Sequence, residues 1–360
     1  MINILQVMGC GNTGGISTVV TNYYTHMDRT QYHFDILLTV PDEGVNAKKL
    51  RDLGCEIYHT VPKSHNRKQY QADLKALLAS GKYQAIHVHE NETSYVALRI
   101  AKKMGIRCRI AHSHTSSPTG SWKAELKRLS GVVFNYHYAT QLLACGQLAG
   151  DRVFGKRHMK SGKATVLPNA IELDRFSYSP EDRAAVRKEL HLENAFVAGM
   201  VGRLAPEKNI PFALHVFRAL VKTRPEAVLL LVGDGEERVK LEQLIQEYQL
   251  NDHVRLLGRR TDVQRLYSAM DVLLMPSIHE GFPMVVVEAS ASGLPILLSD
   301  TVTKEFSWFE NVKYHSLESI YPWLDSLNNR HYYSKRIFIS LIQKYEITCN
   351  VLLLECKYHS

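Results

Sequence analysis

The sequence predicts an α/β fold of two doubly wound, Rossmann-like domains that face each other across a cleft. Short apolar strand candidates alternate with segments of helical periodicity along most of the chain, as in parallel sheets with crossover helices. The alternation pauses near Leu167 and resumes near Val197. The length of 360 residues also favours two domains, because single cores rarely grow beyond about 250–300 residues.

The predicted elements follow in order. In the first series, strands are expected at residues 2–8, 34–40, 56–59, 85–88, 109–112 and 142–145, with helices at 16–27, 68–79, 95–104 and 122–136. Polar turn residues from 167 to about 180 then predict an interdomain connection. In the second series, strands are expected at 197–201, 228–232, 254–257, 272–275 and 296–298, with helices at 212–221, 237–248 and 285–291.

This order divides the chain into a first domain at 1–166, a connection at 167–194, a second domain at 195–303 and a divergent C-terminal segment at 304–360. In the last segment, apolar runs at 336–342 and 351–354 predict either a helix and a strand or two helices. Ligands of doubly wound sheets bind beyond the carboxyl ends of the strands. The loops that follow strands are therefore the candidate sites.

Composition excludes several classes of protein. Hydrophobic residues make up 45% and charged residues 22%, which disfavours disordered and fibrous chains. No apolar run approaches the roughly 18–20 residues that span a bilayer. The first residues predict a β-strand rather than a signal peptide, and the six cysteines are scattered without C-x-x-C spacing. We therefore expect a cytoplasmic protein with reduced, structural cysteines.

Positive charge is concentrated in the first half. Residues 1–165 contain 22 Lys and Arg against 11 Asp and Glu, whereas the remainder contains 22 against 25, so the first half accounts for the net charge of +8. This asymmetry favours an anionic partner, either nucleic acid or an acidic membrane surface; a solvated basic face without a partner is the alternative. The basic helix expected from Trp122 is a candidate for membrane contact or for ordinary packing on its own sheet.

The first strand is followed by a glycine loop, Gly9-Cys-Gly-Asn-Thr-Gly14-Gly15. It matches G-x-G-x-x-G, and a glycine turn lets backbone N–H groups approach a phosphate or a sugar. A dinucleotide site also needs an acidic residue about 20 positions further on, and the nearest candidate, Asp42, is too distant. A glycine loop that contacts another ligand and a purely structural turn remain the two interpretations.

Two cations, Arg203 and Lys208, lie on the loop between a strand and a helix expected near Ile210. Arginine can pair bidentately with phosphate oxygens, and lysine supplies a mobile point charge. This pair is a candidate diphosphate site. The alternative is an exposed loop in which Glu207 pairs with its neighbours.

Two carboxylates, Glu280 and Glu288, flank a loop that becomes a helix at Pro283. Glu288 lies more than a turn inside that helix among apolar residues, so it needs a partner. A ribose diol can supply two donors to Glu288, and sugar hydroxyls can do the same for Glu280. A buried Arg or Lys beside Glu288 is the alternative.

Histidines cluster as His87-Val-His89 and His112-Ser-His114, each pair at the end of a first-half strand. No carboxylate or cysteine of familiar spacing completes a metal site, so we expect none. His114 is the candidate for a hydrogen-bonding group at the cleft. The chain also lacks Asp-x-Asp, the usual handle for a metal-bound diphosphate, so Arg203 and Lys208 should stabilise a leaving diphosphate without Mg²⁺.

Taken together, these segments resemble the retaining, nucleotide-sugar-dependent glycosyltransferases of the GT-B fold (family four, group 1 type), including capsule and exopolysaccharide members. The resemblance covers most of residues 1–303. It rests most firmly on the Arg203/Lys208 pair followed by Glu280-x7-Glu288. Supporting segments are Gly14-Gly15, Ile110-Ala-His-Ser-His114, Leu167-Pro-Asn-Ala-Ile and Val232-Gly-Asp-Gly235.

The resemblance implies a role for each residue of the site. Arg203 and Lys208 would bind the donor diphosphate, Glu280 the donor sugar and Glu288 the ribose. His114, or else His112, would contact the sugar near the reacting centre. The remaining implied donor-binding positions are Gly14 and Gly15 from across the cleft, Gly281, Phe282, Pro283 and Met284 around the sugar and phosphate, and Gly258 and Arg259 beside the base.

The resemblance also implies a metal-independent front-face mechanism, without a cofactor and with a UDP-sugar as the first choice of donor. The acceptor would be a glycan or a lipid-linked molecule, held on the side of the first domain, in synthesis of a surface polysaccharide or glycolipid. The basic first half would make peripheral contact with the inner face of the plasma membrane; no nucleic acid is expected. A 2-epimerase of nucleotide sugars and a catalytically silent binding module are the alternatives. The sequence departs from the family after Glu305, where the helix that closes the family's fold is hard to identify.

Overall fold

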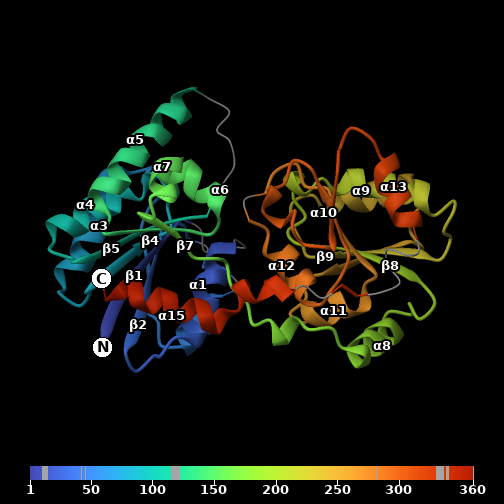
Figure 1. Ribbon diagram of the computed structural model, residues 1–360, viewed down its shortest axis with the longest axis horizontal. Coiled ribbons are helices and arrows are strands. Elements are labelled where there is room, and N and C mark those ends of the chain that lie inside the picture. The colour runs from blue at the N-terminus through green and yellow to red at the C-terminus, as the bar shows by residue number, and fades with distance from the viewer. Residues whose placement is uncertain are drawn as a thin grey trace. The chain divides into compact units, whose positions relative to one another are not determined.

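The computed structural model describes residues 1–9, 15–41, 43–44, 46–114, 122–280, 282–329, 336–337 and 340–359. The chain forms two compact units: Met1–Ile171 together with Lys344–Ser360, and Glu172–Gln343 (Figure 1). Each unit contains its own parallel sheet with helices packed against it. The fold class is therefore the predicted pair of doubly wound, Rossmann-like domains.

The first unit contains a seven-stranded sheet in the order β3-β2-β1-β4-β5-β6-β7. The central strands are buried and carry mostly apolar side chains on both faces, because helices cover both faces of a parallel sheet. Its strands are β1 (Ile2–Met8), β2 (Tyr32–Leu38), β3 (Ile57–His59), β4 (Ala85–Val88), β5 (Cys108–Ser113), β6 (Gln141–Ala144) and β7 (Ala164–Val166). Its helices are α1 (Gly15–His26), α2 (Ala47–Asp52), α3 (Arg67–Ala79), η1 (Asn91–Thr93), α4 (Tyr95–Lys103), α5 (Trp122–Tyr138), α6 (Gln147–Gly150), η2 (Asp151–Gly155), α7 (Lys156–Lys160) and α15 (Ile347–Tyr358).

The second unit contains a six-stranded sheet in the order β10-β9-β8-β11-β12-β13. Apolar residues of β8, β9 and the helix α9 form its core with Trp323. Its strands are β8 (Phe196–Val201), β9 (Ala227–Val232), β10 (Val254–Gly258), β11 (Val272–Met275), β12 (Ile296–Ser299) and β13 (Val312–His315). Its helices are η3 (Asp174–Phe176), α8 (Pro180–Glu189), η4 (Pro206–Lys208), α9 (Ile210–Leu220), α10 (Arg238–Glu247), α11 (Val263–Ala269), α12 (Met284–Ala291), η5 (Lys304–Phe306) and α13 (Tyr321–Asn328). The helix η6 (Ser340–Tyr345) precedes α15.

The unit boundaries differ from the sequence division at both ends of the second domain. Helix α8 lies within the predicted connection, where no helix was expected. It belongs to the second unit, where Arg183 and Arg187 both pair with Asp271, just before β11, at 2.6 and 2.7 Å. Its start follows from local chemistry: Ser179 Oγ accepts the N–H of Asp182 at 3.0 Å, and Pro180 occupies the first turn.

The C-terminal segment is divided between the units. Strand β13 and helix α13 complete the second unit, where Trp323 is 1% exposed and donates to the carbonyl of Ser316 at 2.9 Å. The last run forms a helix, α15, that returns to the first unit and lies beside α1 and the early strands (red against blue in Figure 1). This return was the element that the sequence left unidentified, because its apolar run is short and uninterrupted.

Candidate active site

The candidate donor site lies at the switch point of the second sheet. Strands β8 and β11 are neighbours, but the chain continues from β8 toward β9 on one side and from β11 toward β12 on the other. At such a point the loops that follow the two strands diverge and leave a crevice at the carboxyl edge. Arg203 and Lys208 lie on the loop after β8, and Glu280 lies on the loop after β11.

Lys208 and Glu280 contact each other across the switch point. The Lys208 Nζ lies 2.5 Å from Glu280 Oε1, and both side chains are largely buried. The Ser277 hydroxyl donates to the same carboxylate oxygen at 3.1 Å, and the backbone N–H of Ile278 donates to the carbonyl of Glu207 at 2.8 Å. The two loops are therefore bonded to each other through side chains and backbone.

Arg203 lies nearby and pairs with Glu207, as the alternative interpretation predicted. Its Nη2 donates to Glu207 Oε1 at 2.8 Å, and Glu236 lies 3.6 Å from its Nη1. The bond to Glu207 raises the pKa of Arg203, so the guanidinium stays charged. The side chain remains 44% exposed, so the exposed pair leaves the cation available to an anion.

Glycines hold the arginine loop in place. Gly202, at φ +146°, donates its N–H to Val232, and Gly233, at φ +138°, donates to the carbonyl of Gly258 at 2.8 Å. A Cβ on Gly233 would lie 1.8 Å from the carbonyl oxygen of Gly202, so only glycine fits. Gly258 ends β10 with φ +65°, and Arg259 beside it is exposed. The loops after β8, β9 and β10 are thus hydrogen-bonded to one another along the carboxyl edge of the sheet.

Glu288 lies inside α12, where its partner is a phenol. The Tyr267 hydroxyl donates to Glu288 Oε2 at 2.7 Å, and the Tyr267 side chain is fully buried. Burial raises the pKa of the Glu288 carboxyl, an effect that the Tyr267 bond and the charge of Arg175 partly offset. Among the described residues, no ion pair joins a Lys or Arg to Glu288, so the observed partner is Tyr267 and not the basic side chain of the alternative interpretation.

The residues between the two glutamates form the start of α12. Pro283 is the N-cap residue rather than the first helical residue, and α12 begins at Met284. Phe282 and Met284 are buried, and the ring of Phe282 lies 4.9 Å from that of Phe306. Gly281 and Gly14 lie outside the described residues, as does Asp42, whereas Gly15 is the first residue of α1 with open space at its Cβ position.

In the first unit, His114 belongs to a buried cluster of four histidines at the carboxyl ends of β4 and β5. His89 Nδ1 lies 2.8 Å from His114 Nε2, and His87 Nε2 lies 3.1 Å from His112 Nδ1. Burial lowers the pKa of all four rings, that of His114 to about 3, so they are neutral at physiological pH. Nitrogens of His87, His89 and His112 lie within 4.8 Å of one another, close enough for a shared metal ion, although each ring already has a hydrogen-bond partner.

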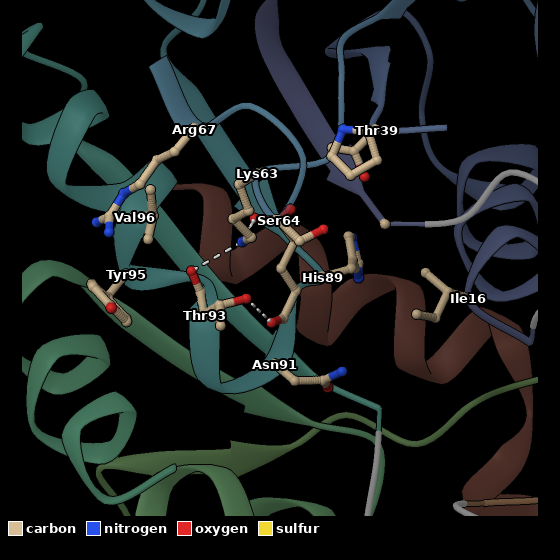
Figure 2. Close-up of a pocket in the computed structure, with 13 residues that line it drawn as sticks. Ile16, Thr39, Lys63, Ser64, Arg67, His89, Asn91, Thr93, Tyr95 and Val96 are labelled. Atoms are coloured by element: carbon tan, nitrogen blue, oxygen red, sulfur yellow. Dashed lines mark hydrogen bonds and ion pairs between the residues drawn. The ribbon is translucent and has the colours of Figure 1, made fainter. Parts of the chain in front are cut away.

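A polar pocket of about 540 Å³ opens beside this cluster (Figure 2). Lys63 and Glu90 form its charged wall, with Lys63 Nζ 2.5 Å from Glu90 Oε2 and the Tyr70 hydroxyl 3.0 Å from the same oxygen. Asn91 adopts φ +51° and accepts the backbone N–H of His114 at 2.9 Å. The remaining lining residues are Gly9, Ile16, Thr39, Pro62, Ser64, Arg67, His89, Thr93, Tyr95 and Val96.

This pocket could not be predicted from the sequence, because its residues come from separate loops with no recognisable spacing. The signal was indirect: each loop follows a strand, and polar residues follow β4 directly. A left-handed asparagine at Asn91 is a further mark of a functional loop, since such residues carry strain.

Two units of this kind, each with its charged loops at the carboxyl edge of a parallel sheet, define the GT-B class of fold. Residues 13–175 match the profile described as Glycosyltransferase Family 4, and residues 182–305 match Glycosyl transferases group 1. EpsF of Bacillus subtilis (strain 168), named as a candidate glycosyltransferase, is 32% identical over 310 residues, which are 84% of this chain and 80% of EpsF. The chain therefore belongs to the glycosyltransferases of family 4, group 1.

More distant relatives extend the comparison. An Escherichia coli UDP-Gal:alpha-D-GlcNAc-diphosphoundecaprenol alpha-1,3-galactosyltransferase is 29% identical over 63% of this chain and 60% of its own length. CapM of Staphylococcus aureus, a capsular polysaccharide biosynthesis glycosyltransferase, is 25% identical over 71% of this chain and 70% of CapM. The structure of HepE from Anabaena in complex with UDP-glucose covers both chains completely with a TM-score of 0.81 at 18% identity, a likeness of fold.

Proposed function

We propose that this glycosyltransferase is a retaining enzyme that moves a sugar from a UDP-sugar to a glycan or lipid-linked acceptor in surface polysaccharide or glycolipid synthesis. The main support is the contact of Lys208 with Glu280 at the switch point. This contact brings the candidate phosphate-binding group and the candidate sugar-binding group together in one site. The UDP-Gal specificity in the name of the E. coli galactosyltransferase, the capsular polysaccharide role of CapM and the UDP-glucose complex of HepE support the donor and product classes.

The catalytic work of the site is electrostatic. Lys208 and the exposed fork of Arg203 would bind the donor diphosphate and stabilise the charge that develops as it leaves. The contacts of Glu280 with Lys208 and Ser277 both use Oε1, so we assign Oε2 to the sugar hydroxyls. Glu288, beyond the start of α12, would accept from the ribose.

Two cations in place of a metal ion make the proposed reaction metal-independent. With no Asp-x-Asp sequence, the chain lacks the usual carboxylate handle for a magnesium diphosphate. On this proposal the leaving phosphate assists proton removal from the acceptor hydroxyl in a front-face reaction, and no side chain acts as a nucleophile. Full activity in the presence of EDTA is the corresponding expectation.

The pocket of the first unit is our candidate for the acceptor site. Its Lys63 and Arg67 suit an anionic acceptor such as a lipid-linked phosphate, and Asn91 and Thr93 offer hydrogen bonds to a sugar. The pocket borders the histidine cluster through His89 (Figure 2). Substrate groups bound there would lie beside His114, the residue expected near the reacting centre.

We also propose peripheral contact with the anionic inner face of the membrane, and hence a cytoplasmic location. Among the described residues no helix is long and apolar enough to span a bilayer. Helix α5 instead exposes Leu126, Leu129 and Val133, spaced three and four residues apart on one face, near the basic segment at 152–163. Exposed apolar and basic side chains together suit an acidic bilayer surface.

Liposome flotation tests the membrane contact. Leu129→Asn with Val133→Asn should reduce binding to anionic vesicles several-fold, whereas Val239→Asn, at an equally exposed apolar position of α10 in the second unit, should not. Equal binding of the wild type to neutral and anionic vesicles contradicts the proposal.

Thermal stabilisation by a panel of nucleotide sugars, with EDTA present, tests the donor site. A ligand at 100 times its dissociation constant adds about 2.7 kcal/mol of stability. We expect a shift with one UDP-sugar that Arg203→Ala largely removes and that Arg238→Ala, a surface arginine paired with Glu242 on α10, retains. A protein that no nucleotide sugar stabilises is a silent relative, and the proposed activity fails.

A further inference from the structure

The four histidines form one hydrogen-bond circuit with Gln6 of β1 and Tyr358 of α15. The Gln6 Nε2 donates to the Tyr358 hydroxyl at 3.0 Å, and that hydroxyl lies 2.8 Å from His87 Nδ1. The Gln6 Oε1 lies 2.8 Å from His89 Nε2. The circuit continues from His87 to His112 and from His89 to His114, and all of these groups belong to the first unit.

The protons of this circuit allow a single solution for each orientation of the Gln6 amide. The Tyr358 oxygen accepts from Gln6, and the buried Tyr358 proton has no described acceptor other than His87 Nδ1. When that proton is donated to His87 Nδ1, His87 donates through Nε2 to His112. On the other branch His89 donates through Nε2 to Gln6 and accepts from His114 Nε2. All four rings are then Nε2–H tautomers.

If the Gln6 amide is turned over, every bond reverses and all four rings become Nδ1–H tautomers. In both cases the rings share one tautomer, since each carries a single proton and burial keeps it neutral. The circuit therefore has two states in which every proton has an acceptor, and mixed tautomers either break one of its bonds or leave the buried Tyr358 proton without an acceptor.

The circuit ends at two buried nitrogens, His112 Nε2 and His114 Nδ1, which have no partner among the described residues. In either state one of them is a donor and the other an acceptor. His112 lies on β5 and His114 directly follows that strand, and the centroids of the two rings are 4.1 Å apart. A hydroxyl group both donates and accepts one hydrogen bond, so it is the chemical group that satisfies both ends.

We propose that Gln6 and Tyr358 are positioning residues that lock the four histidines into one common tautomer, so that His112 Nε2 and His114 Nδ1 hold one hydroxyl group. The hydroxyl belongs either to water or to a sugar. The sugar alternative rests on the proposed function, whereas the tautomer lock does not.

The test is ¹⁵N NMR of the full chain labelled in histidine, where long-range ¹H–¹⁵N correlations distinguish the two tautomers; single histidine variants assign the four rings. At pH 7 we expect four neutral rings with the same tautomer. Any mixture among the four, or a charged ring, overturns the proposal.

Two variants test the roles of the positioning residues. In Tyr358→Phe, His87 and His112 lose the link to Gln6 and should populate both tautomers, whereas His89 and His114 keep theirs. In Gln6→Glu, the ionised carboxylate accepts from both neighbours, so His87 and His112 should carry Nδ1–H while His89 and His114 carry Nε2–H. Tyr32→Phe removes another hydroxyl paired with a histidine at the end of α15, at 2.7 Å, and should change none of the four. Unchanged His87 and His112 tautomers in Tyr358→Phe contradict the lock.

Added ligands identify the source of the hydroxyl. A shift of the His114 Nδ1 resonance with UDP-glucose but not with UDP assigns the hydroxyl to the sugar. An unchanged resonance with both ligands assigns it to water. If the four rings share one tautomer but the protein binds no nucleotide sugar, the tautomer lock is supported and the proposed function is contradicted.

Discussion

At the scale of single residues, the donor site depends on a buried ion pair that serves two purposes. Lys208 and Glu280 stabilise each other in the folded chain, and each is assigned to a different part of the substrate. Removal of either partner leaves an uncompensated buried charge, which usually costs about 3–5 kcal/mol. The same change removes a substrate contact, so effects on stability and on turnover must be separated.

We predict that Lys208→Ala and Glu280→Ala each lower turnover at least about a hundredfold, equivalent to about 2.7 kcal/mol of transition-state stabilisation. Steady-state kinetics with a donor and acceptor pair, at a temperature where both variants are folded by circular dichroism, measures the effect. Lys240→Ala removes an exposed lysine that pairs with Glu237, away from Lys208 and Glu280, and should leave turnover unchanged. Folded variants with wild-type kinetics would remove these residues from the site.

We predict that the charged Glu288 carboxylate lowers the stability of the fold and strengthens ligand binding. Its folded-state pKa is raised by burial, so the fold favours the protonated carboxyl and unfolding becomes easier as pH rises above the unfolded value near 4.5. Glu288→Gln retains an acceptor for Tyr267 and removes the charge. We expect a higher unfolding temperature at pH 7.5, by about 2–4 °C for each 1 kcal/mol gained in a domain of this size.

The same variant should bind the donor at least about tenfold more weakly, because charge-assisted bonds to the ribose are lost. Differential scanning calorimetry at pH 7.5 and pH 4.5 provides the control, since the stability gain should shrink at the lower pH. A destabilised variant at pH 7.5 would show that the carboxylate is better satisfied than its burial indicates.

At the scale of elements, the loops after β8, β9 and β10 are hydrogen-bonded to one another, because glycines at these positions let the backbones come close together. Gly233→Ala brings a Cβ against the carbonyl of Gly202 and should displace the Arg203 loop. We expect a loss of stability above the roughly 1–2 kcal/mol of a left-handed alanine, together with weaker donor binding. Chemical denaturation and ligand titration measure the two effects.

The control for this prediction is Gly54→Ala. Gly54 also has a positive φ, +94°, but a Cβ there meets no atom within 4 Å. It should show the backbone penalty alone and bind the donor normally. Equal losses in the two variants would mean that the close contact at Gly202 relaxes without cost.

The sequence predicted most elements and the donor-side charges, because these have local signals. Strand β9, for example, is an uninterrupted apolar run, and Pro283, the N-cap residue of α12, marks a helix start between Glu280 and Glu288. Strands β7 and β13 were missed because they are short edge strands with few apolar residues. The roles of Tyr267 and Tyr358 depend on contacts between distant segments, for which one sequence carries no signal.

At the scale of the whole molecule, the buried histidines make stability sensitive to mild acid. Their folded pKa values are depressed below the unfolded value of about 6.5, so the unfolded chain binds protons that the folded chain does not. Stability is therefore present above pH 6.5 and lost as pH falls toward the folded pKa values. Each ring that stays neutral contributes a slope of about 1.4 kcal/mol per pH unit.

We predict a fall in the unfolding free energy of the first unit between pH 6.5 and 5.0, before most carboxylates titrate. Urea denaturation, followed by fluorescence at closely spaced pH values, measures the slope. His112→Gln should reduce it by about one proton, whereas His65→Gln, at an exposed position, should leave it unchanged. A flat profile over this range would contradict the neutral, buried cluster.

The return of α15 to the first unit has a consequence for how the protein is made. The ribosome completes the sheet of that unit early, yet residues 344–360, which carry Tyr358, emerge only after the whole second unit has been synthesised. Domains generally fold as they leave the ribosome. Here the second unit can complete its folding first. Until then the histidine cluster of the first unit lacks the Tyr358 hydroxyl. A premature stop before residue 344 would therefore damage the part of the protein translated earliest.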